Sequence, residues 1–272
     1  MSTSMKSKWL ILWVFIWLGM AVGAVAQDTL TVMTYNIYHA ESALKSGNST
    51  LEEIAKFTSA QNPDFVALQE VDSTTRRLAE VNDGRFFGLA DSLAKLTKMI
   101  GYFGKAIDFQ GGGYGIAILS KKAGDVRKVK LPNPQSGEPR VLLKLHAKTN
   151  SGRSIIFAGT HLDHQYKQNR LAQVGAIRKL FSNHQGPVIL AGDFNFEPES
   201  MGYDRMQESW LDAARLFSNK VKPALTYPTE NPEKRIDYIW LTKNVNWQVL
   251  EYETTDVGYS DHLPVMTKIV IN

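Results

Sequence analysis

Six separated segments of the sequence place acidic, amide or imidazole side chains beside an apolar run. These residues are Asn36 in "MTYNIY", Glu70 in "VALQEVD", His161, Asp163 and His164 in "FAGTHLDH", Asp193 and Asn195 in "LAGDFN", Asp237 in "RIDYIWL", and Asp261 and His262 in "YSDHLPV". Such groups can bind cations, orient a ligand and transfer protons. Because ligand sites in open-sheet proteins collect beyond strand ends, we expect the six segments to converge on one site.

Each segment taken alone also has a purely structural explanation. Asn36 can form a turn, Asp193 and Asn195 can form an Asx-turn, and "SDH" can cap a helix or a turn. Glu70 can be an ordinary ion-pair partner, and "THLDH" can be a polar loop. The joint occurrence of all six segments, rather than any one of them, indicates a functional site.

Short runs rich in β-branched and aromatic residues predict the strands that position these side chains. The runs cover residues 29–38, 64–71, 115–121, 140–149, 154–162, 187–194, 235–242, 246–254 and 264–271. Some alternate with period two, and others are continuously apolar, which is typical of strands buried on both faces. The segment "QGGGYG", residues 110–115, lacks the Lys-Ser/Thr of a phosphate-binding loop and is predicted to be a turn entering a strand.

Three amphipathic segments predict helices between the strands. Residues 49–61 contain Thr50 and Glu53 in a capping-box arrangement, and residues 87–100 and 167–184 repeat the helical spacing. The apolar stripes are Leu51, Ile54 and Phe57; Leu89, Leu93 and Leu96; and Leu171, Val174, Ile177 and Phe181. Since no repeat or flexible linker interrupts the chain, the mixture predicts one α/β sandwich with sheets inside and helices outside.

Residues 1–26 have the pattern of a secretory signal peptide. Two lysines are followed by an apolar run over residues 9–22 and by an "AVA" ending. The alternative, an uncleaved anchor helix, is disfavoured because this run is short for a membrane span. We therefore expect cleavage after Ala26, which leaves residues 27–272 as one domain.

The charge and cysteine content exclude several classes of protein. Removing residues 1–26 takes away two lysines and no acid, so the formal charge falls from +4 to +2. A nearly balanced charge is not the footprint of a strong nucleic-acid binder, although a local basic patch stays open. The chain has no cysteine, which excludes disulfides and a lipid-modified cysteine anchor.

The order of these motifs resembles the endonuclease/exonuclease/phosphatase superfamily, the deoxyribonuclease-I-like hydrolases. The resemblance runs from Thr31 to Asn272, and "GDFN" and "SDHLPV" are its most specific parts. "THLDH" followed by Asn169 and Arg170 is similar to a secreted bacterial branch. The resemblance implies a four-layer α/β sandwich, in which two packed mixed sheets are flanked by helices, with residues 27–272 as the catalytic domain.

The resemblance also implies hydrolysis of phosphate esters with a divalent metal, Mg²⁺ or Mn²⁺. Hard cations prefer oxygen ligands and keep several waters, so one or two carboxylates suffice. Glu70 is the first choice as metal ligand, with Asn36 and Asp261 as its helpers. The metal is expected to polarise a non-bridging phosphoryl oxygen and to shield the charge of the transition state.

The remaining motif residues take proton-transfer and positioning roles by the same resemblance. His262 is the general base or charge stabiliser, and Asp237 fixes its ring. Asp193 orients the attacking water or takes its proton, which the resemblance leaves open. Asn195 donates an amide hydrogen to the phosphate. His161 donates to a phosphoryl oxygen or to the leaving group, and Asp108 is a candidate for its partner.

Two further features bear on substrate binding. Arg140 is a candidate phosphate clamp, because a guanidinium can bind two oxygens at once, and the alternative is a simple strand-end arginine. Arg170 is a weaker candidate that can equally pair with a neighbouring acid. The proline-rich loop of residues 222–235 leads to Asp237 and is expected to border the site and to influence specificity.

These observations predict a secreted or periplasmic metal-dependent phosphohydrolase that cleaves phosphomonoesters or phosphodiesters by in-line attack of an activated water. One alternative is an endonuclease acting on DNA or RNA, which the nearly neutral charge disfavours for a processive DNA binder. Another is a catalytically silent binding protein, which the presence of both Glu70 and His262 disfavours. The expected partner is a phosphoester, with nucleic acid left open. The mature protein is expected to be a monomer without a stable membrane anchor.

Overall fold

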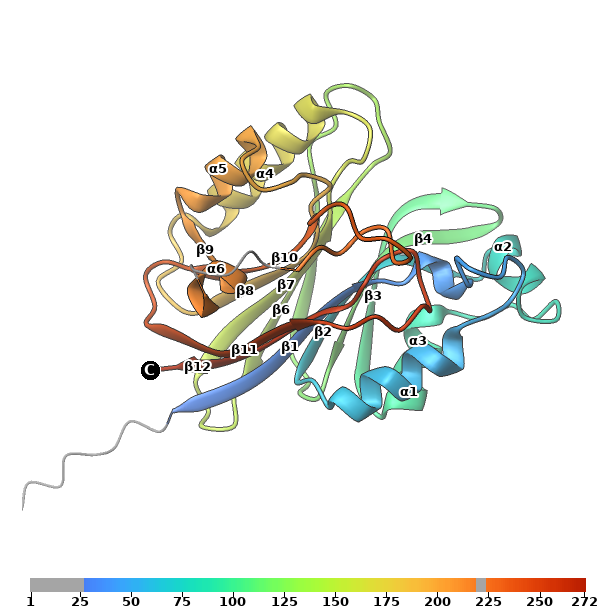
Figure 1. The fold of residues 1–272 in the computed structure, drawn as a ribbon, viewed down its shortest axis with the longest axis horizontal. Helices are drawn as coiled ribbons and strands as arrows, with labels where there is room; N and C mark the ends of the chain where they lie inside the picture. The colour runs from blue at the N-terminus through green and yellow to red at the C-terminus, as the bar shows by residue number, and fades with distance from the viewer. Residues whose placement is uncertain (1–26, 219–223) are drawn as a thin grey trace, which may run out of the picture.

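Two six-stranded sheets form the centre of the computed structural model, which describes residues 27–218 and 224–272. The predicted signal peptide, residues 1–26, lies outside the described residues. Figure 1 shows the sheets face to face, with helices on their outer faces. Within the described ranges, no helix is both long and apolar enough to cross a membrane.

The first sheet has the strand order β11-β12-β1-β2-β4-β3. Its strands are β1 (Asp28–Asn36), β2 (Phe65–Ser73), β3 (Ile100–Phe109), β4 (Gly112–Ser120), β11 (Trp247–Thr254) and β12 (Val265–Ile271). Strand β1 runs parallel to β2 and antiparallel to β12, so the sheet is mixed.

The second sheet has the strand order β5-β6-β7-β8-β10-β9. Its strands are β5 (Asp125–Lys130), β6 (Val141–Lys148), β7 (Ser154–His161), β8 (Val188–Asp193), β9 (Trp210–Asp212) and β10 (Asp237–Thr242). Strands β7 and β8 are parallel, and β10 is antiparallel to β8. Three candidate site residues therefore lie at the same edge of this sheet: His161 at the end of β7, Asp193 at the end of β8 and Asp237 at the start of β10.

Helices cover the outer face of each sheet and complete the four predicted layers (Figure 1). The elements are η1 (Tyr38–Ala40), α1 (Leu51–Gln61), α2 (Arg76–Glu80), α3 (Leu89–Thr97), α4 (Lys167–Phe181), α5 (Met201–Gln207) and α6 (Ala213–Phe217). Helices α1 and α3 pack on the first sheet, while α4 and α5 pack on the second. The predicted four-layer α/β sandwich is thus confirmed.

Burial on both faces explains the continuously apolar strands. In β2, Phe65 and Ala67 point into the core between the sheets, while Val66 and Leu68 point into the core under α1 and α3. Successive side chains of a strand alternate between its faces, so a strand with two buried faces needs an apolar residue at every position. Only the end of such a strand is free for polar residues.

The structure departs from the sequence predictions at the margins of the molecule. Strands β3 and β5 were not predicted, because both lie at sheet edges; β3 is mostly half-buried, and β5 is largely exposed and rich in lysine. Leu96, expected on the buried stripe of its helix, is 40% exposed. Thr50 does precede α1, but its side chain makes no capping hydrogen bond.

The "QGGGYG" segment forms the turn between β3 and β4, as predicted. Gln110 and Gly111 both have positive φ, at 45° and 85°. A Cβ at Gly112 would collide with the carbonyl oxygen of Ser73, and a Cβ at Gly115 with that of Gly104. These glycines are therefore explained by close backbone approach between neighbouring strands.

We predict that Phe157→Ala lowers the free energy of unfolding by about 3–5 kcal/mol, because a large side chain is lost from the closed core. Phe157 is fully buried and stacks on Phe65 of the opposite sheet, with ring centroids 5.0 Å apart. Urea denaturation measures the change. The matched control is Phe86→Ala, since Phe86 is 62% exposed, and a change of about 0.5 kcal/mol or less is expected there. Equal changes in the two variants would contradict this assignment of the core.

Candidate active site

The ends of three adjacent strands in the second sheet bring together three of the predicted site residues. His161 is the partner of Asp193 in the β7–β8 register, and Asp193 is the partner of Asp237 in the β8–β10 register. All three side chains are buried, with exposures of 1–3%. The regular ladder thus fixes the backbone beneath a row formed by an imidazole and two carboxylates.

Asn36, at the end of β1, joins this row to the first sheet. Its Nδ2 lies 3.1 Å from Glu70 Oε1, 3.2 Å from Asp193 Oδ2 and 3.4 Å from His262 Nε2. Its Oδ1 accepts a hydrogen bond from the backbone of Tyr38, and its backbone carbonyl accepts one from Ser260. The amide therefore presents its nitrogen to the acids, and its predicted role as a metal ligand would require the oxygen to turn toward them.

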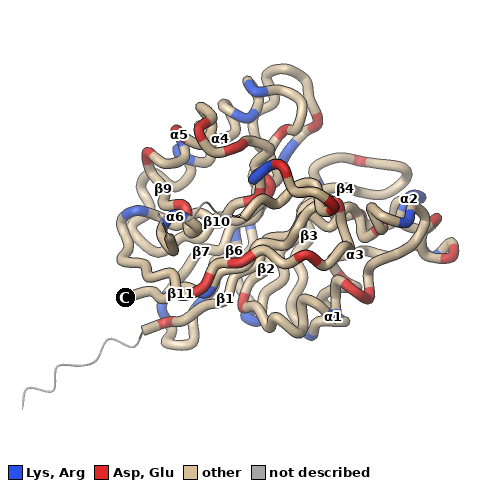
Figure 2. Tube along the Cα trace, viewed as in Figure 1, with Lys and Arg blue, Asp and Glu red and all other residues tan. Residues whose placement is uncertain are grey.

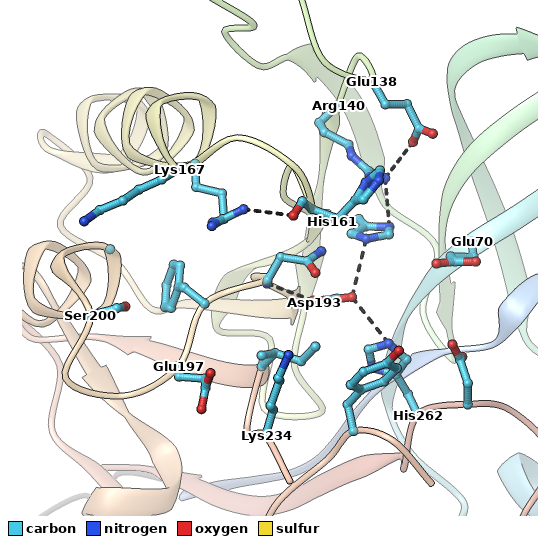
Figure 3. Close-up of a pocket in the computed structure, with 18 of the residues that line it drawn as sticks. Glu70, Glu138, Arg140, His161, Lys167, Asp193, Glu197, Ser200, Lys234 and His262 are labelled. Carbon is cyan, nitrogen blue, oxygen red and sulfur yellow. Dashed lines mark hydrogen bonds and ion pairs between the residues drawn. The ribbon is translucent and has the colours of Figure 1, made fainter. Parts of the chain in front are cut away.

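Glu70 leaves the β2 ladder at a bulge. The pairing register with β4 shifts between Gln69 and Val71, and Glu70 itself has a φ of 57°, a conformation uncommon for a residue with a side chain. The bulge turns the carboxylate toward the pocket, where Figure 3 shows it across from His161 and Asp193. Strained backbone of this kind is typical of functional sites.

Glu70 and Asp261 form a pair of carboxylates that suits a hard cation. Burial raises the pKa of Glu70, and the nearby charge of Asp261 raises it further. Among residues 27–218 and 224–272, no ion pair joins either carboxylate to a basic side chain. The charges of His262 and Arg140 offset this rise in the pKa only in part, and two neighbouring carboxylates are unfavourable unless a cation or a proton lies between them. The donor set therefore fits the predicted divalent metal.

Asp193 stands at the centre of the site. Its Oδ1 accepts a hydrogen bond from the backbone of Asn195, and its Oδ2 lies 3.4 Å from His161 Nε2 and 3.8 Å from His262 Nε2. Burial raises its pKa, and the neighbouring carboxylate of Asp237 raises it further. Asn195 has a φ of 50° and donates its side-chain amide to the carbonyl of Leu162, which leaves one amide hydrogen for another acceptor.

His262 and Asp237 form the predicted buried pair. The imidazole Nδ1 donates to Asp237 Oδ2 at 2.9 Å, while Asp237 Oδ1 is buried without a hydrogen-bond partner among the described residues. Burial alone would lower the pKa of His262, but the charge and hydrogen bond of Asp237, together with Asp193, raise it. The ring of Tyr227 lies against the imidazole, with centroids 4.7 Å apart. The ring orientation is thus fixed on two sides.

Asp193, Asp237 and His262 form a second group that could bind a cation. One ligand atom from each lies within 4.8 Å of the others. The hydrogen bond between His262 Nδ1 and Asp237 Oδ2 already occupies one possible ligand atom of each of these two residues. Glu70 Oε1 accepts a hydrogen bond from Asn36 and Asp261 Oδ1 accepts one from Ser260, so each of these carboxylates keeps its second oxygen for a metal.

His161 takes a different partner from the one suggested by the sequence. Asp108 is exposed and bonds Lys105 at 2.6 Å, whereas His161 Nδ1 lies 3.0 Å from NH1 of Arg140. The second arm of Arg140, NH2, lies 3.0 Å from Nδ1 of His164. The imidazoles therefore each take one donor of the guanidinium, whereas its Nε is buried without a hydrogen-bond partner among the described residues.

A cavity of about 620 Å³ opens over this cluster. Glu70, Arg140, His161, Asp193, Asn195, Asp261 and His262 line it, whereas Asn36 and Asp237 do not reach it and support the lining residues from behind. Tyr227 and Lys234 also line it, in agreement with the prediction that the loop of residues 222–235 borders the site; residues 222 and 223 lie outside the described residues.

Several lining residues carry no signal in the sequence that would single them out. Glu138, Lys167 and Glu197 are charged residues in polar stretches, and only the fold brings them to the cavity. Asp163, in contrast, is turned away from it: its carboxylate accepts backbone hydrogen bonds from Gln165 and Tyr166 and therefore shapes the loop. Asp163 thus has a structural role, which agrees with the alternative interpretation of "THLDH" as a loop.

Comparison with known proteins places this site in context. The model of the Endonuclease/Exonuclease/phosphatase family matches residues 33–262, a range that contains all of the candidate residues. None of the curated proteins with which the chain was compared matches it.

Solved structures with low sequence identity share the fold. A functionally unknown conserved protein from Enterococcus faecalis V583 has a TM-score of 0.73 at 21% identity, covering 89% of this chain and 100% of its own. The human Nocturnin catalytic domain with bound sulfate anion has a TM-score of 0.67 at 20% identity, covering 90% and 98%. A mannosyl-6-phosphatase from Bacteroides thetaiotaomicron has a TM-score of 0.64 at 20% identity, covering 88% and 99%. At these identities the likeness concerns the fold alone.

Proposed function

The chain belongs to the Endonuclease/Exonuclease/phosphatase family, and from this premise we propose that it is a divalent-metal-dependent hydrolase of phosphomonoesters or phosphodiesters. One observation carries the proposal. The buried carboxylate of Asp193 lies between the Nε2 atoms of two imidazoles and faces the same cavity as the Glu70–Asp261 pair. In this arrangement Asp193 can orient a water for attack on phosphorus. A metal held by Glu70 and Asp261 would stabilise the negative charge on the displaced oxygen.

In this proposal Glu70 and Asp261 would hold Mg²⁺ or Mn²⁺, which would supply Lewis-acid polarisation of a phosphoryl oxygen. Asn36 orients the Glu70 carboxylate through its amide, and thereby links the metal side of the site to Asp193. This role needs no contact between Asn36 and the metal.

The other residues bind the phosphoryl group and move the proton. Asp193 accepts a hydrogen bond from the attacking water, and its raised pKa suits it to take the proton. His262, oriented by Asp237, carries positive charge next to the reacting group. Asn195, through its remaining amide hydrogen, and His161, through Nε2, donate to phosphoryl oxygens. Pre-aimed donors of this kind stabilise the transition state because they need no reorganisation.

A small phosphoester is the substrate class that the cavity favours. Its volume of about 620 Å³ matches a small-molecule pocket. Figure 2 shows Lys and Arg interspersed with Asp and Glu along the trace, which does not support a continuous basic track for a polynucleotide. Two proteins of the same fold, a mannosyl-6-phosphatase and a Nocturnin domain with bound sulfate, also support a small anionic ligand.

The test is hydrolysis of para-nitrophenyl phosphate and bis-para-nitrophenyl phosphate with magnesium, with and without chelator. We expect chelator-sensitive turnover of at least one of them. A panel of sugar phosphates, phospholipids, RNA and plasmid DNA then identifies the class. Metal-dependent nicking of plasmid that falls steeply with salt would favour the endonuclease. Absence of turnover on every substrate would favour a silent binding protein and refute the proposal.

We predict that Glu70→Gln raises the metal concentration needed for half-maximal activity by about 10- to 100-fold, because it removes a charged oxygen ligand. Calorimetric titration with magnesium measures the same change without turnover. Glu80→Gln, on the exposed end of α2, is the matched control and is expected to leave the metal affinity unchanged. Unchanged affinity in Glu70→Gln would place the metal on a different ligand set.

We also propose that the enzyme acts outside the cytoplasm, as a monomer released by cleavage after Ala26. The basic start, apolar run and "AVA" ending of residues 1–26 support export, and the lack of cysteine makes the fold independent of the redox state there. Mass spectrometry of the exported protein tests the cleavage site, and an intact N-terminus would refute it.

A further inference from the structure

A single buried guanidinium connects two histidines of the cavity. Arg140 is 4% exposed, and its NH1 lies 2.8 Å from Glu138 Oε1 and 3.0 Å from His161 Nδ1. Its NH2 lies 3.0 Å from His164 Nδ1. Figure 3 shows these contacts as one continuous chain from Glu138 through Arg140 and His161 to Asp193. Glu138 balances the positive charge, so the guanidinium can be held there without a phosphate.

The chemistry of the guanidinium fixes the protonation of both rings. An arginine side chain has five N–H donors, no acceptor, and keeps its proton in proteins. Each Nδ1 that faces it must therefore accept a hydrogen bond and carry no proton. Each ring then carries its proton on Nε2, and neither is an imidazolium while the bond to Arg140 lasts.

Both Nε2–H groups are available to the cavity. His161 directs Nε2 to Asp193 Oδ2 at 3.4 Å, which is long for a hydrogen bond and leaves this donor easily redirected. His164 is exposed and lines the same cavity. The cationic guanidinium behind the rings polarises both of them, which makes the Nε2–H groups better donors to an anion.

We propose that His161 and His164 form a two-donor site for an oxyanion of the substrate, and that Arg140 is the positioning residue that sets both tautomers. The inference rests on the proposed phosphohydrolase function and assigns a ligand contact to His164. The chemical class bound is a tetrahedral oxyanion such as a phosphoryl group. Arg140 does not contact the phosphate, which separates this model from a direct guanidinium clamp.

The first experiment reads the tautomers without any turnover. Long-range ¹H–¹⁵N correlation spectra of the full chain, in the presence of chelator, distinguish Nε2–H from Nδ1–H imidazoles. We expect His161 and His164 both to show the Nε2–H pattern, and Arg140→Gln, which removes the charged donors, to shift the Nδ1 signals of both rings. Titration with inorganic phosphate should shift both Nε2 signals. An Nδ1–H or imidazolium pattern at either ring, or Nδ1 signals that stay unchanged at both rings in Arg140→Gln, would overturn the proposal.

The second experiment is a double-mutant cycle on kcat/KM with para-nitrophenyl phosphate. We expect Arg140→Gln and His161→Gln each to lower kcat/KM by about 10²-fold, and the double variant to lose little more than either single variant. A direct clamp would instead make the two losses multiply, which would overturn the positioning role. His164→Gln should lower kcat/KM by about 10-fold, and an unchanged value would remove His164 from the site.

Two controls keep the outcomes separable. Arg178→Met removes an arginine that pairs with Glu208 on the surface of α4, and is expected to leave the spectra and the rate unchanged. Arg140→Lys keeps the buried charge beside Glu138 if Arg140→Gln does not fold, and its single ammonium should shift the Nδ1 signal of at least one ring. Should the wild-type protein hydrolyse no phosphoester, the function fails, whereas the spectra and the phosphate titration still decide the tautomer proposal.

Discussion

Replacing Asp193 with asparagine is expected to lower kcat by about 10²- to 10⁴-fold while the protein stays folded. The carboxylate is buried at the end of β8, and both of its oxygens face polar groups of the site. Asparagine has nearly the same shape and can still accept from the backbone of Asn195, so the turn after the strand should persist. It cannot take a proton from water, and this loss is the reason for the expected fall in rate.

The measurement separates binding from chemistry. Single-turnover rates of Asp193→Asn should fall, while its affinity for inorganic phosphate in the presence of magnesium should change much less. Asp108→Asn is the matched control, because Asp108 is exposed and, among the described residues, its ion pair is with Lys105. If Asp193→Asn kept the wild-type rate, the carboxylate would have no role in activating water and the mechanism would need another base.

Most of the site was predictable because burial on both faces leaves few positions for polar groups. Along β8 every residue from Val188 is buried, so the first carboxylate, Asp193, marks the point at which the strand leaves the core. The same reasoning applies to Asn36 at the end of β1. For Asp237 the polar residue comes at the start of a fully buried strand, which carries the same information.

The orientations within the site were not predictable, since they depend on tertiary contacts. The bulge at Glu70 appears only where β2 pairs with β4, and no residue type in "VALQEVD" requires it. The sequence shows Arg140 at the start of a strand but not the two imidazoles that face its guanidinium. Exposed edge strands such as β5 lack the apolar pattern on which strand prediction depends.

The fold also explains why the two halves of the site depend on each other. Asn36 belongs to the first sheet and contacts Asp193 and His262 from the second sheet and the loop before β12. The core between the sheets therefore sets the distance between the metal side and the proton-transfer side. A change in packing there is expected to affect turnover more than substrate binding, because a displacement of about 1 Å can disturb the attack geometry.

The second largest loss of activity is expected from substitutions in the Asp237–His262 pair. Asp237→Asn should lower kcat by about 10²- to 10⁴-fold, because the neutral amide no longer stabilises a protonated His262. The amide can also donate to Nδ1, which reverses the tautomer that the wild-type carboxylate enforces. The substitution removes one of two neighbouring buried carboxylates and thereby relieves the repulsion that raises the pKa of Asp193. It also removes the charge and the hydrogen bond that stabilise the protonated His262, and because breaking a buried ion pair costs more than this repulsion, we expect the metal-free variant to be less stable than the wild type.

Separate measurements of stability and rate test this prediction. Thermal unfolding of the metal-free protein should show a lower Tm for Asp237→Asn, and kcat should fall as well. His262→Gln should lose a similar factor, and the double variant little more, because the carboxylate acts through the imidazole. A lower Tm together with a wild-type kcat would show that the pair is only structural. Losses that multiply in the double variant would show that Asp237 contributes to turnover independently of His262, for example as part of the second cation group with Asp193.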